Sequence, residues 1–300
     1  MKKLIIILIS FILLCVGFIG IIFIDVMRDG ELNNPIVAKL IFKYMQSKQL
    51  DTGSNYIDIP LTDINGDQHN LSEFIDGKWL MLDFSDYYCG VCHEICPFLE
   101  YSAQTYGGDI NLVTISNDNK EDFTKFVEEE SITWPAYHNQ EAYSIYNIFA
   151  RPTFIMISPE GKVKETFNGG SINWLLNTFS KYSESAKPQI EQYNDVTIIN
   201  HPAIESNING LIISKIDVYS DSTVLSLVPI SRKFSISSRT ALHCSDSSVC
   251  KAIYSSIGFD NSIDRKQNTS VKVTFESLPT NIEGFDYIDG DFRVMGVKVK

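Results

Sequence analysis

Apolar and polar positions along the chain divide it into regions of different texture. Residues 4–24 carry no charged side chain and are long enough, at helical rise, to cover the hydrocarbon core of a bilayer. Apolar positions at i, i+4 spacing from Pro35 predict an amphipathic spacer helix that packs on the next domain. The changes of texture predict a transmembrane anchor (1–24), a spacer helix and linker (25–54), an α/β domain (55–183), a linker (184–195) and an all-β sandwich (196–300).

The α/β domain is predicted from runs that switch between strand-like and helix-like periods. Asn65-Gly66 is a strong hairpin signal within Tyr56–Ser72, and Pro135 predicts that Ile132–Tyr137 is an edge strand. Further strands are expected at Trp79–Phe84, Asn111–Ser116, Thr153–Ile157 and Val163–Phe167, and helices after Cys92 and at Asp118–Glu130, Gln140–Phe149 and Ile172–Tyr182. This alternation favours a central mixed sheet flanked by helices.

Two cysteines lie where the strand Trp79–Phe84 gives way to a helix. The order predicts that Cys89 sits at a helix N-terminus, where free N–H groups and the helix dipole stabilise an anion. A thiolate is such an anion, so the pKa of Cys89 is expected to fall and its nucleophilicity to rise. Cys92, one turn further on, is close enough to resolve a mixed disulfide formed at Cys89. The pattern therefore predicts a redox-active dithiol.

Four elements in this order resemble the thioredoxin superfamily. They are Asp83 before the dithiol, Cys89-x-x-Cys92 itself, Pro97 after it, and Arg151-Pro152-Thr153 before a strand. The Asn65-Gly66 hairpin and the insertion 118–137 are similar to membrane-anchored TlpA/ResA-type thioredoxins. The resemblance implies a thioredoxin-like fold for about residues 56–182. The end of the chain, from Phe285, resembles a β-sandwich module that accompanies such domains in some bacterial proteins.

The resemblance also implies roles for single residues. Asp83 matches the buried acid that moves the proton of the resolving cysteine, and burial on a core strand is expected to raise its pKa. Pro152 matches the cis-proline that faces the dithiol. Arg151 and Thr153 then flank the substrate, and the charge of Arg151 either lowers the thiolate pKa, favours acidic substrates or points to water. Tyr88 stands where the family usually has Trp, and is expected to shield the dithiol.

The remaining cysteines have simpler interpretations. Cys15 lies inside the anchor and is expected to be inert. Cys96 falls on the same helical face as Cys92 and is interpreted as a small buried side chain, with a third redox thiol as the alternative. Cys244 and Cys250, in the β region, predict a local structural disulfide, with two free thiols or a substrate-like pair as alternatives.

Other chemistries fit the same residues less well. Cys89-x-x-Cys92-His93 also spells the attachment motif of c-type haem, but the upstream strand, Pro97 and Arg151-Pro152-Thr153 favour a thioredoxin and leave His93 as an exposed helix residue. Cys89, Cys92, His93 and Cys96 cannot easily surround zinc from one helix turn. The segment before Cys89 lacks the Pro of the peroxiredoxin pattern and the hydroxyl that this pattern has three residues before the cysteine. We therefore expect neither a metal nor a cofactor.

Composition narrows the location and the partners. The net charge of −12 argues against nucleic-acid binding, which needs a basic surface. Lys2 and Lys3 precede the apolar segment and predict a cytoplasmic N-terminus. The rest of the chain would then lie outside the cytoplasm of a bacterial cell, in the periplasmic or equivalent extracytoplasmic space. A cleaved signal peptide is the alternative, although the segment lacks an Ala-x-Ala-like site.

Together these features predict a single-pass, membrane-tethered thiol–disulfide oxidoreductase whose substrates are protein disulfides. By resemblance to TlpA/ResA-like proteins, the direction is reduction, with electrons delivered by a membrane partner. Oxidation or isomerisation of protein disulfides is the alternative within the chemistry, because Gly90-Val91 does not set the reduction potential. The alternative outside it is a binding protein whose β-sandwich recruits a partner or a glycan.

Overall fold

The computed structural model describes residue 17 and residues 35–208, 211–231, 233–264, 269–290 and 292–300. The predicted anchor at residues 4–24 therefore lies outside the described residues apart from Gly17. Within the described part, no helix combines the length and the apolar character needed to cross a membrane. The chain divides into two compact units, Met1–Asp51 and Thr52–Lys300.

The first unit contributes one described helix, α2 (Pro35–Gln46). Its predicted position is confirmed, and proline occupies the first turn, where its missing N–H costs no hydrogen bond. The packing of this helix on the next domain stays a prediction. Val37 is buried, whereas the larger apolar side chains further along the helix are exposed.

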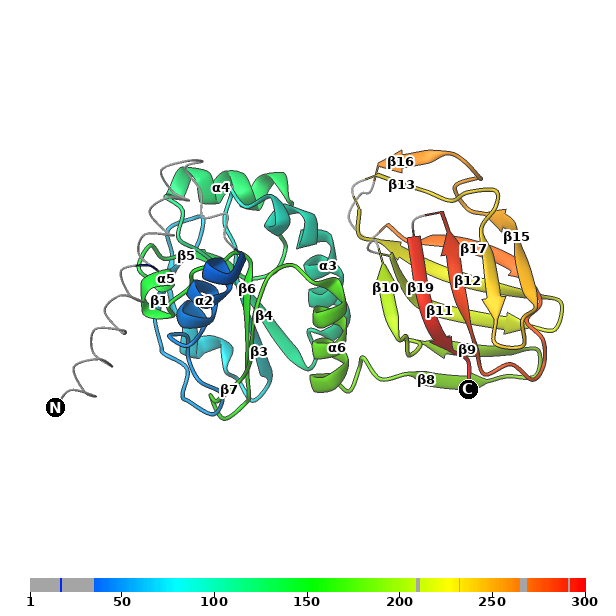
Figure 1. Cartoon of the computed structure of the whole chain (residues 1–300), viewed down its shortest axis with the longest axis horizontal. Coiled ribbons are helices and arrows are strands. Elements are labelled where there is room, and N and C mark those ends of the chain that lie inside the picture. Colours follow the sequence, from blue (N-terminus) through cyan, green and yellow to red (C-terminus); the bar gives the residue numbers. More distant parts are fainter. Residues whose placement is uncertain (1–16, 18–34, 209–210, 232, 265–268, 291) are drawn as a thin grey trace. The chain divides into compact units, whose positions relative to one another are not determined.

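The α/β part of the second unit is built on a sheet with the strand order β2-β1-β5-β4-β3-β6-β7 (Figure 1). The strands are β1 (Pro60–Thr62), β2 (Gln68–Asn70), β3 (Trp79–Phe84), β4 (Ile110–Ser116), β5 (Ala136–His138), β6 (Thr153–Ile157) and β7 (Val163–Asn168). The central strand β3 pairs parallel with β4 and antiparallel with β6. The sheet is therefore mixed, as the alternation of elements predicts, and β3 ends beside the dithiol.

The α/β part also contains five described helices, of which two start at a side-chain cap and one at the cysteine turn. They are η1 (Leu71–Phe74), α3 (Gly90–Tyr106), α4 (Lys120–Glu129), α5 (Ala142–Ile145) and α6 (Ile172–Tyr182). Asn119 caps α4 and Ser171 caps α6, each accepting a bond from a backbone N–H of the first turn. Residues of α3 and α6, among them Phe98 and Phe179, share one buried core with Met81 of β3. This packing fixes the long helix that begins at the dithiol.

Two local predictions differ from the structure. β5 is an interior strand between β4 and β1, although Pro135 precedes it. Because the proline lies just before the strand, its missing N–H takes no donor from the ladder. Its carbonyl oxygen still accepts the N–H of Thr114. The helical stretch expected at residues 140–149 is reduced to the single turn α5.

The rest of the second unit is β-rich. Within the described residues, one antiparallel sheet has the order β10-β19-β18-β14-β15-β17-β12-β11-β9-β8, and β13 pairs with β16 (Figure 1). The strands are β8 (Gln189–Gln192), β9 (Val196–Asn200), β10 (Ser206–Ile208), β11 (Leu211–Tyr219), β12 (Ser222–Pro229), β13 (Lys233–Ser235), β14 (Ala241–Cys244), β15 (Val249–Ser255), β16 (Ser262–Asp264), β17 (Val271–Glu276), β18 (Gly284–Asp289) and β19 (Phe292–Lys298).

This sheet changes partner along β15. The first residues of β15 pair with β14, and its later residues, from Ala252, pair with β17. Apolar residues from both halves of the ladder, such as Leu225 and Tyr287, join one core cluster. The all-β character is confirmed, whereas the sandwich arrangement stays a prediction. β8 lies inside the stretch predicted as a linker, because Gln189–Gln192 pairs with β9.

Candidate active site

The two cysteines of the motif are joined by a disulfide in the structure, with Cα atoms 5.2 Å apart. Cys89 is the N-cap residue of α3, and its sulfur accepts the N–H of Cys92 at 3.2 Å. Its carbonyl oxygen accepts the N–H groups of Cys92 and His93. The sequence therefore folds here as predicted, with Cys89 facing the free donors of a helix N-terminus.

The two sulfur-bearing residues differ in exposure. Cys92 is fully buried, whereas Cys89 is half-buried and reachable from solvent. An outer cysteine beside an inner one is the arrangement that attack followed by resolution requires.

Gly170 is a residue that the sequence analysis missed. It lies against the dithiol turn so closely that an added Cβ would be 2.4 Å from a methyl carbon of Val91.

Asp83 is buried on β3, as predicted. Its carboxylate accepts hydrogen bonds from Ser85 Oγ at 2.5 Å and Thr114 Oγ1 at 2.8 Å, and Trp134 Nε1 donates to Thr114. Burial raises the pKa of Asp83 from 3.8 to about 6, against the opposing effect of these hydrogen bonds. Thr114 lies directly opposite Asp83 on β4. A carboxyl group with this pKa can exchange a proton near neutral pH.

The residues around Pro152 are placed near the start of β6. The Arg151–Pro152 peptide bond is cis, as the resemblance implies. Arg151 Nη1 forms an ion pair with Asp86 Oδ2, and Asp86 is almost fully buried. The positive charge is thus matched by a neighbouring carboxylate, which weakens the hypotheses that it acts on the thiolate or selects acidic substrates. The side chain of Thr153 is buried, 2.8 Å from both Ala150 O and Asn168 Oδ1, and so supports the loop from within.

Asp86 links the ion pair to the dithiol turn. Its backbone carbonyl accepts the N–H of Cys89 at 3.2 Å, while its side chain holds Arg151. The second carboxylate oxygen, Oδ1, is buried and has no hydrogen-bond partner among the described residues. Asp86 therefore connects the nucleophile's turn with the loop of Pro152. The positive charge of Arg151 was the only hint of this pairing in the sequence.

Helix α4 and Asp118, which precedes its N-cap, hold the loop before Cys89. Asp118 accepts the N–H of Tyr87 at 2.8 Å, and Tyr88 donates its hydroxyl to Asp122 at 3.1 Å. Tyr88 is nevertheless 75% exposed. The hydrogen bond to Asp122 also raises the pKa of Tyr88. Tyr88 is positioned by α4 while its ring remains open to a ligand.

His93 is tied down, contrary to the expectation of an exposed residue. Its Nδ1 lies 2.5 Å from Glu130 Oε1 and its Nε2 lies 2.7 Å from the carbonyl oxygen of Tyr87. The Glu130 side chain is only 5% exposed. The contact joins the first turns of α3 to the end of α4, and the sequence contained no periodic signal for it.

The chain is similar to one protein family and to several known proteins. Residues 52–166 match the model of the AhpC/TSA family. The chain is 27% identical over 150 residues to the thiol-disulfide oxidoreductase ResA of Geobacillus kaustophilus, covering 48% of this chain and 83% of that protein. For ResA of Bacillus subtilis the identity is 23% over 136 residues, covering 44% and 75%. The solved thioredoxin domain of a thiol-disulfide oxidoreductase from Bacteroides vulgatus is 26% identical, with TM-score 0.41, covering 45% of this chain and 99% of that one.

These similarities support a thioredoxin-like domain of the TlpA/ResA type at residues 52–166. The family match ends before the β-rich region, which begins at Gln189. All of the residues to which the sequence analysis assigned thiol chemistry in this domain, from Asp83 to Thr153, fall inside the matched part.

Cys96 of the thioredoxin domain is a buried free thiol. Its sulfur donates to the carbonyl oxygen of Cys92 at 3.3 Å, along the helix and one turn below the dithiol. The structure therefore places Cys96 as the small buried side chain of the first interpretation.

Within the described residues, no group of three or more His, Cys, Asp or Glu side chains is arranged to hold a metal ion.

The predicted disulfide of the β-rich region is corrected by the structure. Cys244 and Cys250 are free and buried, with their sulfur atoms 3.8 Å apart. They lie diagonally across the β14–β15 hairpin, in which Cys250 is paired with Leu242 rather than with Cys244. The sulfur of Cys250 also contacts the carbonyl oxygen of Ser277 at 3.4 Å. Proximity in sequence brought the thiols together but did not join them.

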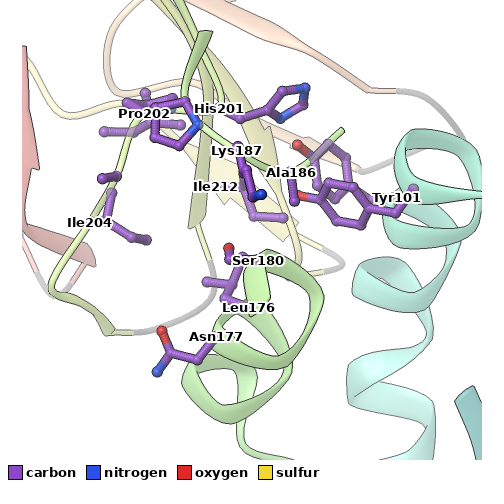
Figure 2. A pocket seen from close by; sticks show the side chains of 14 residues that line it. Tyr101, Leu176, Asn177, Ser180, Ala186, Lys187, His201, Pro202, Ile204 and Ile212 are labelled. Atoms are coloured by element: carbon purple, nitrogen blue, oxygen red, sulfur yellow. The ribbon is translucent and has the colours of Figure 1, made fainter. Parts of the chain in front are cut away.

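A pocket of about 180 Å³ lies away from the dithiol, at the C-terminal half of α3 (Figure 2). Tyr101 comes from α3, Ser180 from α6, and His201 and Ile212 from the β-rich region. Burial lowers the pKa of His201, which favours its neutral form. None of the residues assigned to thiol chemistry lines this pocket, so it is not part of the candidate active site.

Proposed function

We propose that the chain is a thiol–disulfide oxidoreductase that reduces disulfides of protein substrates. The observation that carries the proposal is the Cys89–Cys92 pair at the N-terminus of α3, with the outer sulfur accessible and the inner one buried. The similarity to proteins named thiol-disulfide oxidoreductase ResA supports the same chemistry.

The reaction follows from this arrangement. The Cys89 thiolate attacks one sulfur of the substrate disulfide, whose second sulfur leaves as a thiolate and takes a proton. Cys92 then loses its proton, for which Asp83 with a pKa of about 6 is the proposed acceptor, and attacks the Cys89 sulfur. The substrate leaves with two thiols and the protein holds the Cys89–Cys92 disulfide, the state seen in the structure. A donor of two electrons must restore the dithiol.

Trapping tests the reaction directly. In full-length protein, Cys92→Ser removes the resolving thiol and is expected to accumulate a mixed disulfide at Cys89 with a substrate such as insulin. The matched control, Cys89→Ser/Cys92→Ser, keeps the fold but has no nucleophile and is expected to trap nothing. Equal trapping by both variants, measured on non-reducing gels and by mass spectrometry, would show that Cys89 is not the attacking group.

The direction of the reaction depends on the reduction potential of the Cys89/Cys92 couple. A value near about −270 mV would support the proposed reductase, and one near about −120 mV an oxidase. Equilibration of the full chain with glutathione buffers, read by alkylation, measures it. A value close to the oxidase end would replace the reductive assignment with the oxidative one.

Membrane tethering is the second part of the proposal. Residues 4–24 are uncharged and Lys2 and Lys3 precede them, which supports a single-pass anchor with a cytoplasmic N-terminus, an extracytoplasmic catalytic domain and a membrane electron donor. Full-length protein is expected to stay with the membrane pellet after extraction with alkaline carbonate. Release into the supernatant would contradict the anchor without touching the thiol chemistry.

A further inference from the structure

Helix α2 presents an apolar face to its surroundings. Leu40, Ile41, Tyr44 and Met45 are between 37% and 61% exposed. Their spacing of i, i+1, i+4 and i+5 places them on one side of the helix. Contiguous exposed apolar side chains on one face are typical of a surface that another phase or molecule covers.

The charges of the same segment have one sign. Lys39, Lys43 and Lys48 are the charged residues between Glu31 and Asp51, within a chain whose net charge is −12. Lys39 and Lys43 follow each other at i, i+4, on the side of α2 away from the apolar face. A basic helix with an apolar face, in an otherwise acidic protein, complements an anionic lipid surface.

The position of α2 in the chain supports the same partner. Its first residue, Pro35, follows the uncharged segment 4–24 by a short connection. Even fully extended, this connection spans at most about 40 Å. If residues 4–24 are anchored, α2 stays within this distance of the bilayer.

We propose that α2 binds the membrane surface as an interfacial helix. Leu40, Ile41, Tyr44 and Met45 enter the boundary between headgroups and acyl chains, and the lysines lie at the level of the lipid phosphates. This inference rests on the proposed tether, which brings α2 to the bilayer. It assigns a partner to the face that the spacer interpretation expected to be packed away.

Photo-crosslinking tests the contact. Full-length protein in vesicles of phosphatidylcholine and phosphatidylglycerol carries benzoylphenylalanine in place of Tyr44, or, as control, in place of Tyr193, which is similarly exposed in the loop after β8. Lipid adducts at Tyr44 are expected to exceed those at Tyr193 at least about tenfold. No lipid adduct at Tyr44, or adducts to a second copy of the chain instead, would overturn the proposal.

Charge reversal separates the lysines from the anchor. Lys39→Glu/Lys43→Glu is expected to reduce lipid adducts at Tyr44 several-fold on anionic vesicles and little on vesicles of phosphatidylcholine alone. An equal yield before and after reversal on anionic vesicles would remove the lysines from the proposal.

Failure of the tether is read separately. If carbonate releases the full chain, flotation with anionic vesicles decides whether α2 binds lipid without an anchor. Binding that is lost in Ile41→Gln/Met45→Gln, but kept in the control Ile190→Gln, would retain the interfacial helix, because Ile190 is an exposed apolar residue of β8. If the full chain does not float with the vesicles either, both the tether and the interfacial helix are overturned.

Discussion

The protein contains two pairs of nearby cysteines in different surroundings. Cys89 and Cys92 lie at a helix N-terminus, with one sulfur accessible, and are joined by a disulfide. Cys244 and Cys250 lie inside a hairpin, are both buried and remain 3.8 Å apart. Burial away from water is the larger cause, and the neighbouring Cys244 the next, of a pKa of Cys250 that is raised to about 12.

The contrast shows that reactivity follows the environment of a thiol. A helix N-terminus offers N–H groups and a positive dipole end to a thiolate, which the buried hairpin does not. Buried carbonyl groups such as that of Ser277 accept a thiol proton and therefore favour the neutral form of Cys250. The first pair is arranged for exchange, and the second for packing in the core of the β-rich region.

The largest difference between the pairs is expected in catalysis. Cys89→Ser should lower the rate of insulin reduction by at least about 10³-fold, because the nucleophile is lost. Cys250→Ser should leave the rate unchanged, since its thiol lies in the other core. Turnover assays with the full chain measure both. A large loss in Cys250→Ser with an unchanged melting temperature would abolish the distinction between the pairs.

Alkylation sharpens the same comparison. In the reduced, folded protein at pH 7, Cys89 should react with iodoacetamide about 10³-fold faster than Cys250, because a pKa of about 12 leaves almost no thiolate. Time-resolved mass spectrometry of labelled peptides gives the two rates. Comparable rates would mean that burial does not protect the hairpin thiols.

The proposed proton transfer by Asp83 concerns the first pair only. In Asp83→Asn, turnover at pH 7 should fall by about 10²-fold, because the buried proton acceptor is removed. Wild-type turnover should also fall below pH 6, where Asp83 becomes protonated. If Asp83→Asn keeps full activity, Asp83 is not the proton acceptor. Asp86, which is also buried, would then be the other candidate.

The stability of the same variant has a defined sign. Because the folded-state pKa of Asp83 is raised to about 6, the folded protein keeps a proton that the unfolded chain loses near pH 4. The stabilisation that the bound proton gives the folded protein is therefore complete below pH 4 and is lost as the pH rises through 6. Asp83→Asn should therefore be more stable than wild type at pH 8, by at most about 3 kcal/mol, and similar at pH 4. Urea unfolding of the oxidised protein measures both differences.

The contact between His93 of α3 and Glu130 at the end of α4, which we call the clamp, is expected to have a smaller effect on turnover and stability. Glu130→Gln replaces a nearly buried carboxylate that contacts His93, and should cost about 1–3 kcal/mol of unfolding free energy and a few-fold in turnover. The control Glu121→Gln removes an exposed partner of Lys125 on the same helix and should change neither. Identical melting temperatures for the two variants would show that the clamp does not stabilise the dithiol turn.

Tyr88 gives the smallest expected change. Tyr88→Phe keeps the exposed ring beside the dithiol and loses only the hydroxyl bond to Asp122, so turnover should change less than about twofold. Tyr88→Ala, which removes the ring, should raise the KM for a protein disulfide more than that for a small disulfide. Equal effects of both substitutions would assign the role of Tyr88 to its hydroxyl.

Much of the fold can be predicted from local patterns. α6 has the bounds expected from its apolar period, and the Asn65-Gly66 turn sits between β1 and β2. The interior position of β5 was not predictable, because a proline before a strand and one within it look alike in sequence. The extent of α5 was likewise decided by packing, since only Ala142–Ile145 keeps the helical turn.

By itself, the sequence determined the dithiol and its place at a helix N-terminus, because both depend on residues within a few positions of one another. Only the tertiary structure decided the partners that come from distant segments: Asp86 with Arg151, His93 with Glu130, and Gly170 against Val91. It also left Cys244 and Cys250 unjoined. A hydrogen bond or disulfide needs atoms within a few tenths of an ångström of one geometry, and the packing of whole elements sets that distance.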